Sequence, residues 1–169
     1  DVDSSGTVWL KAWDRMYYIR GDSLSEVAPP YGMDGVRYSF SFADNTPWLV
    51  NGNRLFRYER HTGSWRRIHT SASSRDTITG TAPCKTGGLW IGWSNGLIYL
   101  VRDTSVIQNI PTHYGEPHLI LDDGKGRLWV HTRKVIFTVS TSEGQQLRIV
   151  PFVQDAGSPA DITPPMMLD

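Results

Sequence analysis

Apolar and polar residues alternate in short runs along this chain, and turn-forming residues separate the runs. Every second side chain is apolar in residues 36–42 (VRYSFSF), and a further short apolar run occupies residues 106–110 (VIQNI). A hydrophobic period of two predicts half-buried β-strands. Breaks such as Asn51-Gly52-Asn53 and Ser94-Asn95-Gly96 are strong hairpin signals. The pattern therefore predicts an all-β chain.

Four tryptophans head matching segments along this pattern. Trp9, Trp48, Trp90 and Trp129 lie in VWL, PWLV, LWIG and LWVH, at intervals of 39, 42 and 39 residues. A fixed period of about 40 residues is typical of propeller blades or solenoid units. We interpret the four tryptophans as one structural position that recurs in each unit.

The residues before each tryptophan predict a tight turn. Gly6, Gly87 and Gly126 each stand three residues ahead of their tryptophan. Glycine there suits the positive φ of a hairpin turn with a bulge. In the second unit, residues 44–48 (DNTPW) are shorter and contain a proline, so we expect that turn to be built differently.

Each unit reads as a four-stranded antiparallel meander, which is what a β-propeller blade requires. A meander this short cannot bury both faces alone, so the tryptophans are expected to fill the space between stacked blades. The expected blades are residues 1–30, 36–70, 76–111 and 117–153, all approximate, followed by a leading strand at about 161–169.

The first unit lacks a leading strand of its own, because the chain begins at a turn. Residues 161–169 follow the fourth unit in the position of a leading strand. They are expected either to complete the first blade and close the ring, or to complete a blade in another chain.

Composition agrees with this fold and excludes several classes of protein. The chain has 169 residues, with 7 Trp, 7 Tyr, 5 Phe, 16 Gly and 10 Pro, a mixture of strand formers and turn formers. With 17 basic and 17 acidic residues the formal charge is zero, which disfavours nucleic-acid binding. No apolar stretch is long enough for a membrane helix, so any membrane attachment would lie in a domain outside this chain.

The two best copies of the repeat are residues 85–100, with GLWIGWSNGL, and residues 119–139, with LDDGKGRLWV. In these segments the chain resembles the two-component regulator propeller repeat. That resemblance implies the extracytoplasmic sensor part of a bacterial inner-membrane receptor, on its periplasmic or extracellular side. The kinase or cyclase output domain would lie outside this chain. The segment itself would be non-enzymatic and would need no cofactor.

The resemblance also implies possible partners. Complete propellers of that family usually hold more than four blades. We therefore expect this chain to be a piece of a larger ring, completed by a second copy of the chain or by further blades. The expected ligand, a small molecule such as a saccharide, comes instead from the residues: the aromatic rings of Trp13 and Trp93 beside Asn and Arg donors could stack a sugar or another planar ligand.

The sequence offers weak candidates for metal or covalent chemistry. Asp1 to Gly6 resembles the start of a calcium loop, but Ala12 stands where the loop needs glutamate, so a plain turn is the better interpretation. No Cys/His spacing resembles a zinc site, and no metal is expected. Cys84 stands in a turn, partly exposed by expectation, without a partner for nucleophilic chemistry.

The arginines of residues 54–67 alternate with aromatic residues, as on an outer strand with one wet side. A binding surface is easier to place by topology. Ligands of propellers gather where the connections between blades meet the hairpin turns that follow the tryptophan strands. The candidate ligand-binding residues there are Trp13, Arg15, Tyr31, Asn53, Trp93, Asn95, His113, Tyr114 and Arg133. For Trp13 and Trp93, stacking on a planar ligand and packing between blades are equally open.

Two other functions stay open. One is an enzyme that uses a histidine of this loop face, as in propeller lyases, with His113 and His131 as the residues to test. The chain contains five histidines (His61, His69, His113, His118 and His131), and no fixed spacing with an acid or nucleophile supports catalysis. The other is a scaffold that binds only other proteins.

Overall fold

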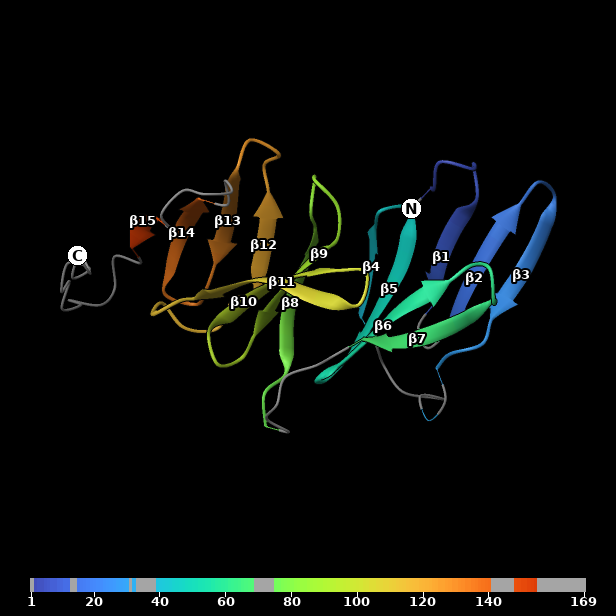
Figure 1. Ribbon diagram of the computed structural model, residues 1–169, viewed down its shortest axis with the longest axis horizontal. Coiled ribbons are helices and arrows are strands. Elements are labelled where there is room, and N and C mark those ends of the chain that lie inside the picture. Colours follow the sequence, from blue (N-terminus) through green and yellow to red (C-terminus); the bar gives the residue numbers. More distant parts are fainter. Residues whose placement is uncertain are drawn as a thin grey trace.

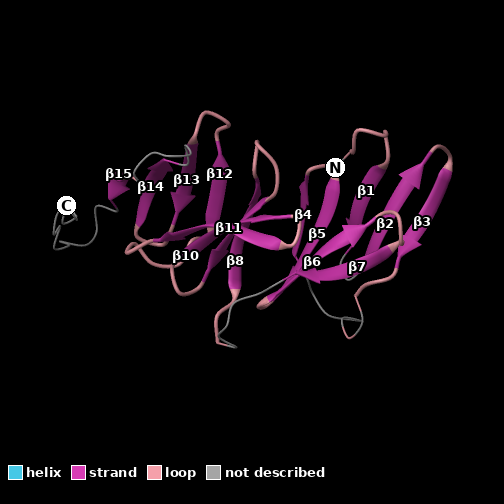
Figure 2. Cartoon of the chain, viewed as in Figure 1, coloured by secondary structure: helices cyan, strands magenta, loops and turns pink. Residues whose placement is uncertain are grey.

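Fifteen β-strands make up the regular structure of the described residues. The computed structural model describes residues 2–12, 15–30, 32, 39–68, 75–140 and 148–154. Figure 2 shows strands joined by loops. No helix occurs in these ranges, and hence none there has the length and apolar character needed to cross a membrane. The predicted all-β class is confirmed.

The strands form four antiparallel sheets, each made of consecutive strands (Figure 1). These sheets are the blades of a β-propeller. Blade 1 contains β1 (Val8–Ala12), β2 (Arg15–Arg20) and β3 (Ser23–Val27). Blade 2 contains β4 (Ser39–Ala43), β5 (Thr46–Asn51), β6 (Arg54–Glu59) and β7 (Ser64–Ile68). Blade 3 contains β8 (Ile78–Pro83), β9 (Leu89–Trp93), β10 (Leu97–Arg102) and β11 (Ser105–Pro111). Blade 4 contains β12 (Leu119–Asp122), β13 (Arg127–His131), β14 (Val135–Ser140) and β15 (Ile149–Gln154).

The leading strands β4, β8 and β12 lie next to one another on the inner side of the row of blades. A hydrogen bond between the hydroxyls of Ser41 and Thr81 joins β4 to β8. Blade 1 has three strands among the described residues, and an isolated antiparallel bridge between Val2 and Val8 occupies the place of its leading strand. Residues 161–169, expected to supply a leading strand, lie outside the described residues.

Neighbouring blades pack in one consistent way: the tryptophan face of one blade covers the opposite face of the next. Trp9 packs with Leu49 and Phe56 between blades 1 and 2. Trp48 packs with Leu89 and Ile91 between blades 2 and 3. Burial of one such side chain is worth about 4–6 kcal/mol of transfer free energy. These tryptophans therefore hold the blades together.

The third interface repeats this arrangement and the fourth tryptophan breaks it. Trp90 is 1% exposed and packs with Ile120 and Val130 between blades 3 and 4. Trp129 occupies the same strand position in blade 4 but is only half-buried, because no further blade of the described chain covers it. The structure thus shows Trp9, Trp48 and Trp90 filling inter-blade space, whereas the same role for Trp129 stays a prediction, because no blade after blade 4 lies in the described residues.

The turns before the tryptophan strands have the conformations expected from the glycine pattern. Gly6, Gly87 and Gly126 have φ values of 77°, 106° and 81°. In blade 2 the turn instead places Asp44 and Asn45 at φ 51° and 55°. Asparagine and aspartate tolerate this left-handed region better than other side chains, so the shorter DNTPW segment makes a turn of a different type.

Candidate functional site

The hairpin turns after the tryptophan strands of blades 2 and 3 lie beside connections between blades. In blade 3 the amide of Ser94 donates to the carbonyl of Thr77 (2.8 Å), at the entry to the blade. The amide of Thr112 donates to the carbonyl of Gly96 (3.1 Å), at the exit from it. We call this edge the connection face; its described parts are residues 15, 51–53, 75–77, 94–96, 112–118 and 132–134.

The connection face also joins one blade to the next. The amide of Ile78, at the start of blade 3, donates to the carbonyl of Gly52 in the hairpin turn of blade 2 (2.9 Å). Thr79 Oγ1 donates to the carbonyl of Pro117, in the connection that enters blade 4. Loops from three blades are thereby fixed relative to one another.

Asn95 makes hydrogen bonds within its own hairpin turn and to the connection that enters blade 3. Its amide nitrogen donates to Asp76 Oδ2 (3.0 Å), and its amide oxygen accepts from the backbone of Leu97 (3.1 Å). Thr77 adds a backbone hydrogen bond to the hydroxyl of Ser94 (3.0 Å). The predicted donor Asn95 therefore stands at an exposed position, where it fixes the geometry of the hairpin turn.

Trp93 lies inside the molecule. It is 1% exposed, packs between blades 2 and 3, and makes an edge-to-face contact with Tyr99 at 5.9 Å between ring centroids. Its position favours packing between blades, one of the two roles considered for it, and leaves no ring face open for stacking. Among the described residues, its indole Nε1 has no hydrogen-bond partner.

The connection between blades 3 and 4 carries the exposed candidates. Tyr114 is half-buried against Phe137, with ring centroids 5.0 Å apart, and Thr112 Oγ1 donates to the carbonyl of Gly115 (3.4 Å). His113 stands between these two anchored residues with its side chain exposed. The loop therefore presents an imidazole and a tyrosine edge from a fixed backbone.

The turn after β13 is fixed by a buried hydroxyl. Thr132 Oγ1 accepts from the amide of Val135 (3.2 Å) and donates to the carbonyl of the same residue (3.2 Å). Arg133 and Lys134 project from this turn into solvent. Two cations are thereby held on the connection face of blade 4.

The remaining candidates are spread along the same edge. Asn53 is half-buried after β5, and Arg15 begins β2 with its guanidinium 3.2 Å from both carboxylate oxygens of Glu26. Trp13 and Tyr31 lie outside the described residues. The structure thus brings Asn95, His113 and Tyr114 into adjoining loops, whereas Arg15, Asn53 and Arg133 stand on turns of three other blades.

Sequence reasoning missed a close approach between blades 3 and 4 beneath these loops. A Cβ at Gly92 would lie 2.8 Å from Cβ of Pro117, and one at Gly80 would lie 3.2 Å from the carbonyl oxygen of His118. Such distances exclude a larger side chain without movement. The sequence around Gly80 and Gly92 gave no sign of this close approach, which depends on the packing of two blades.

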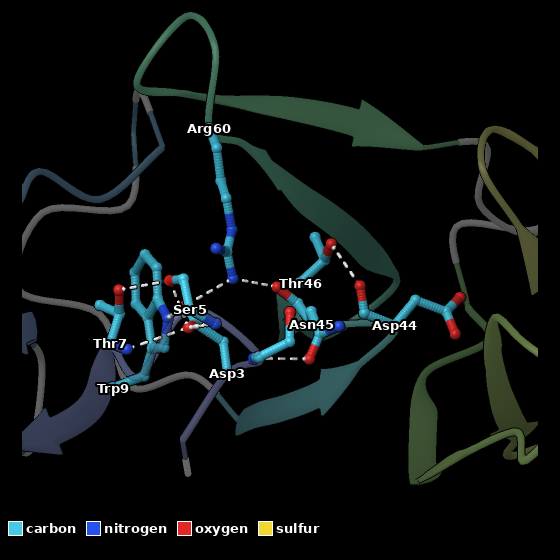
Figure 3. A network of polar contacts seen from close by, with 9 residues as sticks. Asp3, Ser5, Thr7, Trp9, Asp44, Asn45, Thr46 and Arg60 are labelled. Atoms are coloured by element: carbon cyan, nitrogen blue, oxygen red, sulfur yellow. Dashed lines mark hydrogen bonds and ion pairs between the residues drawn. The ribbon is translucent and has the colours of Figure 1, made fainter.

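The opposite edge, which we call the turn face, contains the turns before the tryptophan strands. Figure 3 shows its network around Asp3. The Asp3 carboxylate accepts from the amides of Ser5 (2.8 Å) and Thr7 (2.9 Å) and from Nε1 of Trp9 (3.1 Å), and it lies 2.7 Å from Nη2 of Arg60 in blade 2. Asp3 is thus the acceptor at the centre of its turn.

Burial opposes ionisation of Asp3, but the hydrogen bonds from Ser5, Trp9 and Thr7 outweigh it and hold the pKa of this carboxyl well below its usual range. Arg60 also donates to the carbonyl of Asn45, and the amide of Ser4 donates to the side-chain oxygen of Asn45 (3.0 Å). The network therefore ties the turns of blades 1 and 2 together (Figure 3).

The turn face continues into blades 3 and 4. Asp44 of blade 2 accepts from the amide of Gly88, and Asp122 of blade 4 accepts from the amide of Lys85 (3.1 Å). Cys84, in the same turn, is a buried free thiol, which corrects the expectation of partial exposure. No group of three or more metal-ligating side chains occurs in the described part of the chain. The hydrogen bonds of the turn face therefore join neighbouring blades.

No protein-family profile matches this chain, and no curated protein matches its sequence. Solved structures do match its fold. Virginiamycin B lyase from Staphylococcus aureus has a TM-score of 0.72 and 15% identity, over 93% of this chain and 55% of the lyase chain. The extracellular domain of BT3049, a proposed hybrid two-component system of B. thetaiotaomicron, has a TM-score of 0.60 and 16% identity, over 88% of this chain and 22% of its own.

A second such domain from B. thetaiotaomicron, that of BT4673, has a TM-score of 0.52 and 12% identity, over 94% of this chain and 28% of its own. This chain therefore spans about half of the lyase and about a quarter of the two sensor-system domains. Identities this low show the shared fold and no shared activity. The chain is a set of β-propeller blades, similar in fold both to a lyase and to extracellular domains of two-component systems.

Proposed function

We propose that this chain is a non-enzymatic, ligand-sensing segment of an extracytoplasmic β-propeller in a bacterial two-component-type receptor. The observation that carries the proposal is the connection face, where Asn95, His113 and Tyr114 occupy adjoining loops with anchored backbones. The fold likeness to extracellular domains of two-component systems supports the same assignment. The wider receptor, including its output domain, is part of the proposal.

The chemistry of the connection face suits a polar ligand with a flat side, such as a saccharide. His113 and Arg133 offer exposed hydrogen-bond donors, and the half-buried ring of Tyr114 offers an apolar edge with a hydroxyl. Binding at loops of several blades would favour one packing of the blades over another. That population shift is our mechanism for signalling to a distant output domain.

Calorimetric titration of the 169-residue chain with a panel of mono- and oligosaccharides tests the proposal. We expect saturable binding that His113→Ala and Arg133→Ala each weaken by at least about tenfold, a loss of about 1.4 kcal/mol. Both side chains are exposed, so the variants should keep the thermal stability of the parent. Lys125→Ala, an exposed cation of the turn face, is the matched control and should bind as the parent does.

Saturable binding that neither variant alters would remove the ligand from the connection face. An absence of small-molecule binding would favour the protein-binding scaffold. The lyase alternative makes a separate prediction, since incubation with substrate should then yield a product that disappears on replacing His113 or His131 while folding survives. Mass spectrometry of the incubated panel distinguishes turnover from simple binding.

A further inference from the structure

The outer face of blade 4 is apolar and has no blade against it in the described chain. The strand register aligns Leu121, Trp129, Thr138 and Val150 in one row across β12 to β15, on the side opposite Ile120 and Val130. Leu121 is 59% exposed, Val150 is exposed and Trp129 is half-buried. We call this surface the Trp129 face.

Blade 1 presents a second apolar face at the other end of the molecule. The register aligns Val2, Val8, Ile19 and Leu24 in one row, on the side of the sheet opposite Trp9. Leu24 is 64% exposed, and Val2 is exposed as well. We call this surface the Leu24 face.

The two end faces are the unmatched halves of the interface that the molecule already builds three times. In each internal interface a tryptophan face covers the opposite face of the following blade, as Trp48 covers Leu89 and Ile91. Within the described residues, the Trp129 face is a tryptophan face without a following blade, and the Leu24 face is an opposite face without a preceding one. Each end therefore has the surface that the other end lacks.

A single copy does not bring these faces together, since blades 1 and 4 lie at opposite ends of the row (Figure 1). Exposed apolar patches of this kind mark interaction surfaces. A second copy supplies both missing halves, and the formal charge of zero adds no net repulsion between copies. A head-to-tail contact of this type forms a closed ring when its rotation closes.

We propose that the Trp129 face docks on the Leu24 face of a second copy of this chain, and that two copies joined at both ends form one ring of eight blades. This chain matches 55% of the length of the lyase chain. Two copies of this chain together therefore have about the length of one lyase chain. The docking does not depend on the proposed ligand, and its test needs none.

Light scattering after size-exclusion chromatography of the 169-residue chain measures the assembly. The expected mass is twice the 19.0 kDa of one chain. Leu121→Glu and Leu24→Glu each place a charge on one end face and should each reduce the mass to that of a single chain. Ile107→Glu is the matched control, because Ile107 is an apolar residue 54% exposed on β11 of an internal blade, and this variant should keep the doubled mass.

Mixing the two end-face variants tests the head-to-tail arrangement. The Leu121→Glu chain keeps an intact Leu24 face, and the Leu24→Glu chain keeps an intact Trp129 face. A mixture should therefore regain the doubled mass at high concentration, although neither variant does so alone. Circular dichroism should show that both variants retain the β-sheet spectrum, since both positions are exposed in the single chain.

Three results would overturn the proposal. A parent chain that stays at 19.0 kDa at high concentration would assign the end faces to further blades of a longer chain. A doubled mass that Leu24→Glu leaves intact would mean that two Trp129 faces pack on each other. A mass above two chains would mean that the contact does not close after two copies.

Discussion

Nε1 of the Trp90 indole lies 3.1 Å from Oδ2 of Asp122 and donates a hydrogen bond to it across the boundary between blades 3 and 4. The same carboxylate accepts from the amides of Lys85 (3.1 Å) and Gly124 (2.8 Å). One side chain of blade 4 therefore holds both the indole and the turn of blade 3. Because Trp90 is 1% exposed, its indole nitrogen has no water to replace a lost acceptor.

Replacement of Asp122 by alanine should lower the free energy of unfolding by about 1–3 kcal/mol, since it leaves the Trp90 indole and the Lys85 amide without their acceptor. Urea denaturation followed by tryptophan fluorescence measures the change. Asp22→Ala, in an exposed turn of blade 1, is the control and should change stability by less than about 0.5 kcal/mol. Equal effects of the two substitutions would contradict a special role for Asp122.

The carboxyls of the turn face should make stability depend on pH in the acid range. Burial opposes ionisation of Asp122, but hydrogen bonds from Gly124, Trp90 and Lys85 outweigh it, so its pKa is lowered, as is that of Asp3. Both ionised forms therefore stabilise the fold above the ordinary carboxyl pKa of about 4, and this contribution is lost as the pH falls below it. Urea midpoints measured between about pH 6 and pH 2.5 should fall accordingly. Asp3→Asn should flatten that fall; an unchanged slope would exclude Asp3 as a contributor.

The buried and the end-face tryptophans should differ in their cost of removal. Trp90→Ala should destabilise by about 3–5 kcal/mol, as expected for a large side chain enclosed between two blades. Trp129→Ala should cost below about 2 kcal/mol when measured at a dilution where the chain is monomeric, because part of this ring is already in water. Similar losses at both positions would mean that Trp129 is covered in solution.

Gly88 should tolerate no side chain. Its φ is +91°, and a Cβ would overlap the carbonyl oxygen of Val101. Gly115 has nearly the same φ (+89°) with nothing within 4 Å, so it is a matched control for backbone strain alone. Gly115→Ala should cost about 1–2 kcal/mol, and Gly88→Ala about 1–3 kcal/mol more, in thermal or urea unfolding. A Gly88→Ala variant as stable as Gly115→Ala would show that the β10 backbone moves aside freely.

The repeat could be predicted from the sequence because each blade is a meander of consecutive strands. The tryptophan interval and Gly6, Gly87 and Gly126 report on contacts within about 40 residues, where pattern and turn chemistry decide the structure. The degenerate turn at Asp44 and Asn45 was also signalled, by its shorter length. Local rules therefore gave the fold class and the position of the tryptophan strands.

The environment of individual aromatics depends on neighbouring blades, which the pattern of one blade does not describe. Trp93 is buried because it shares the side of β9 with Leu89 and Ile91, opposite Trp90. Side chains of a strand alternate between its two faces, so Trp93 lies on the face opposite Trp90 if the strand is regular to its end. The sequence alone could have indicated this position. Trp129 has the same local sequence signals as Trp90 and differs only in what lies against it.

The hydrogen bonds of the candidate site were even harder to predict from the sequence. Asn95 meets Asp76 across 19 residues through loops with no regular pattern. Trp48 lacks the acceptor that Trp90 has. Pro83 occupies, in blade 3, the register position that Asp122 has in blade 4, and the buried Trp48 indole nitrogen has no hydrogen-bond partner among the described residues. A proline side chain offers no acceptor there.

In the described part of the chain, the three core clusters each join two adjacent blades, so the packing there links each blade to its neighbours. In such a linear arrangement the outermost units are supported on one side and open first. Amide hydrogens in β5 and β9 should then outlast those in β2 and β14 during exchange into heavy water. Closure of the ring would give every blade a neighbour on both sides. The difference in amide exchange between inner and outer blades would then disappear.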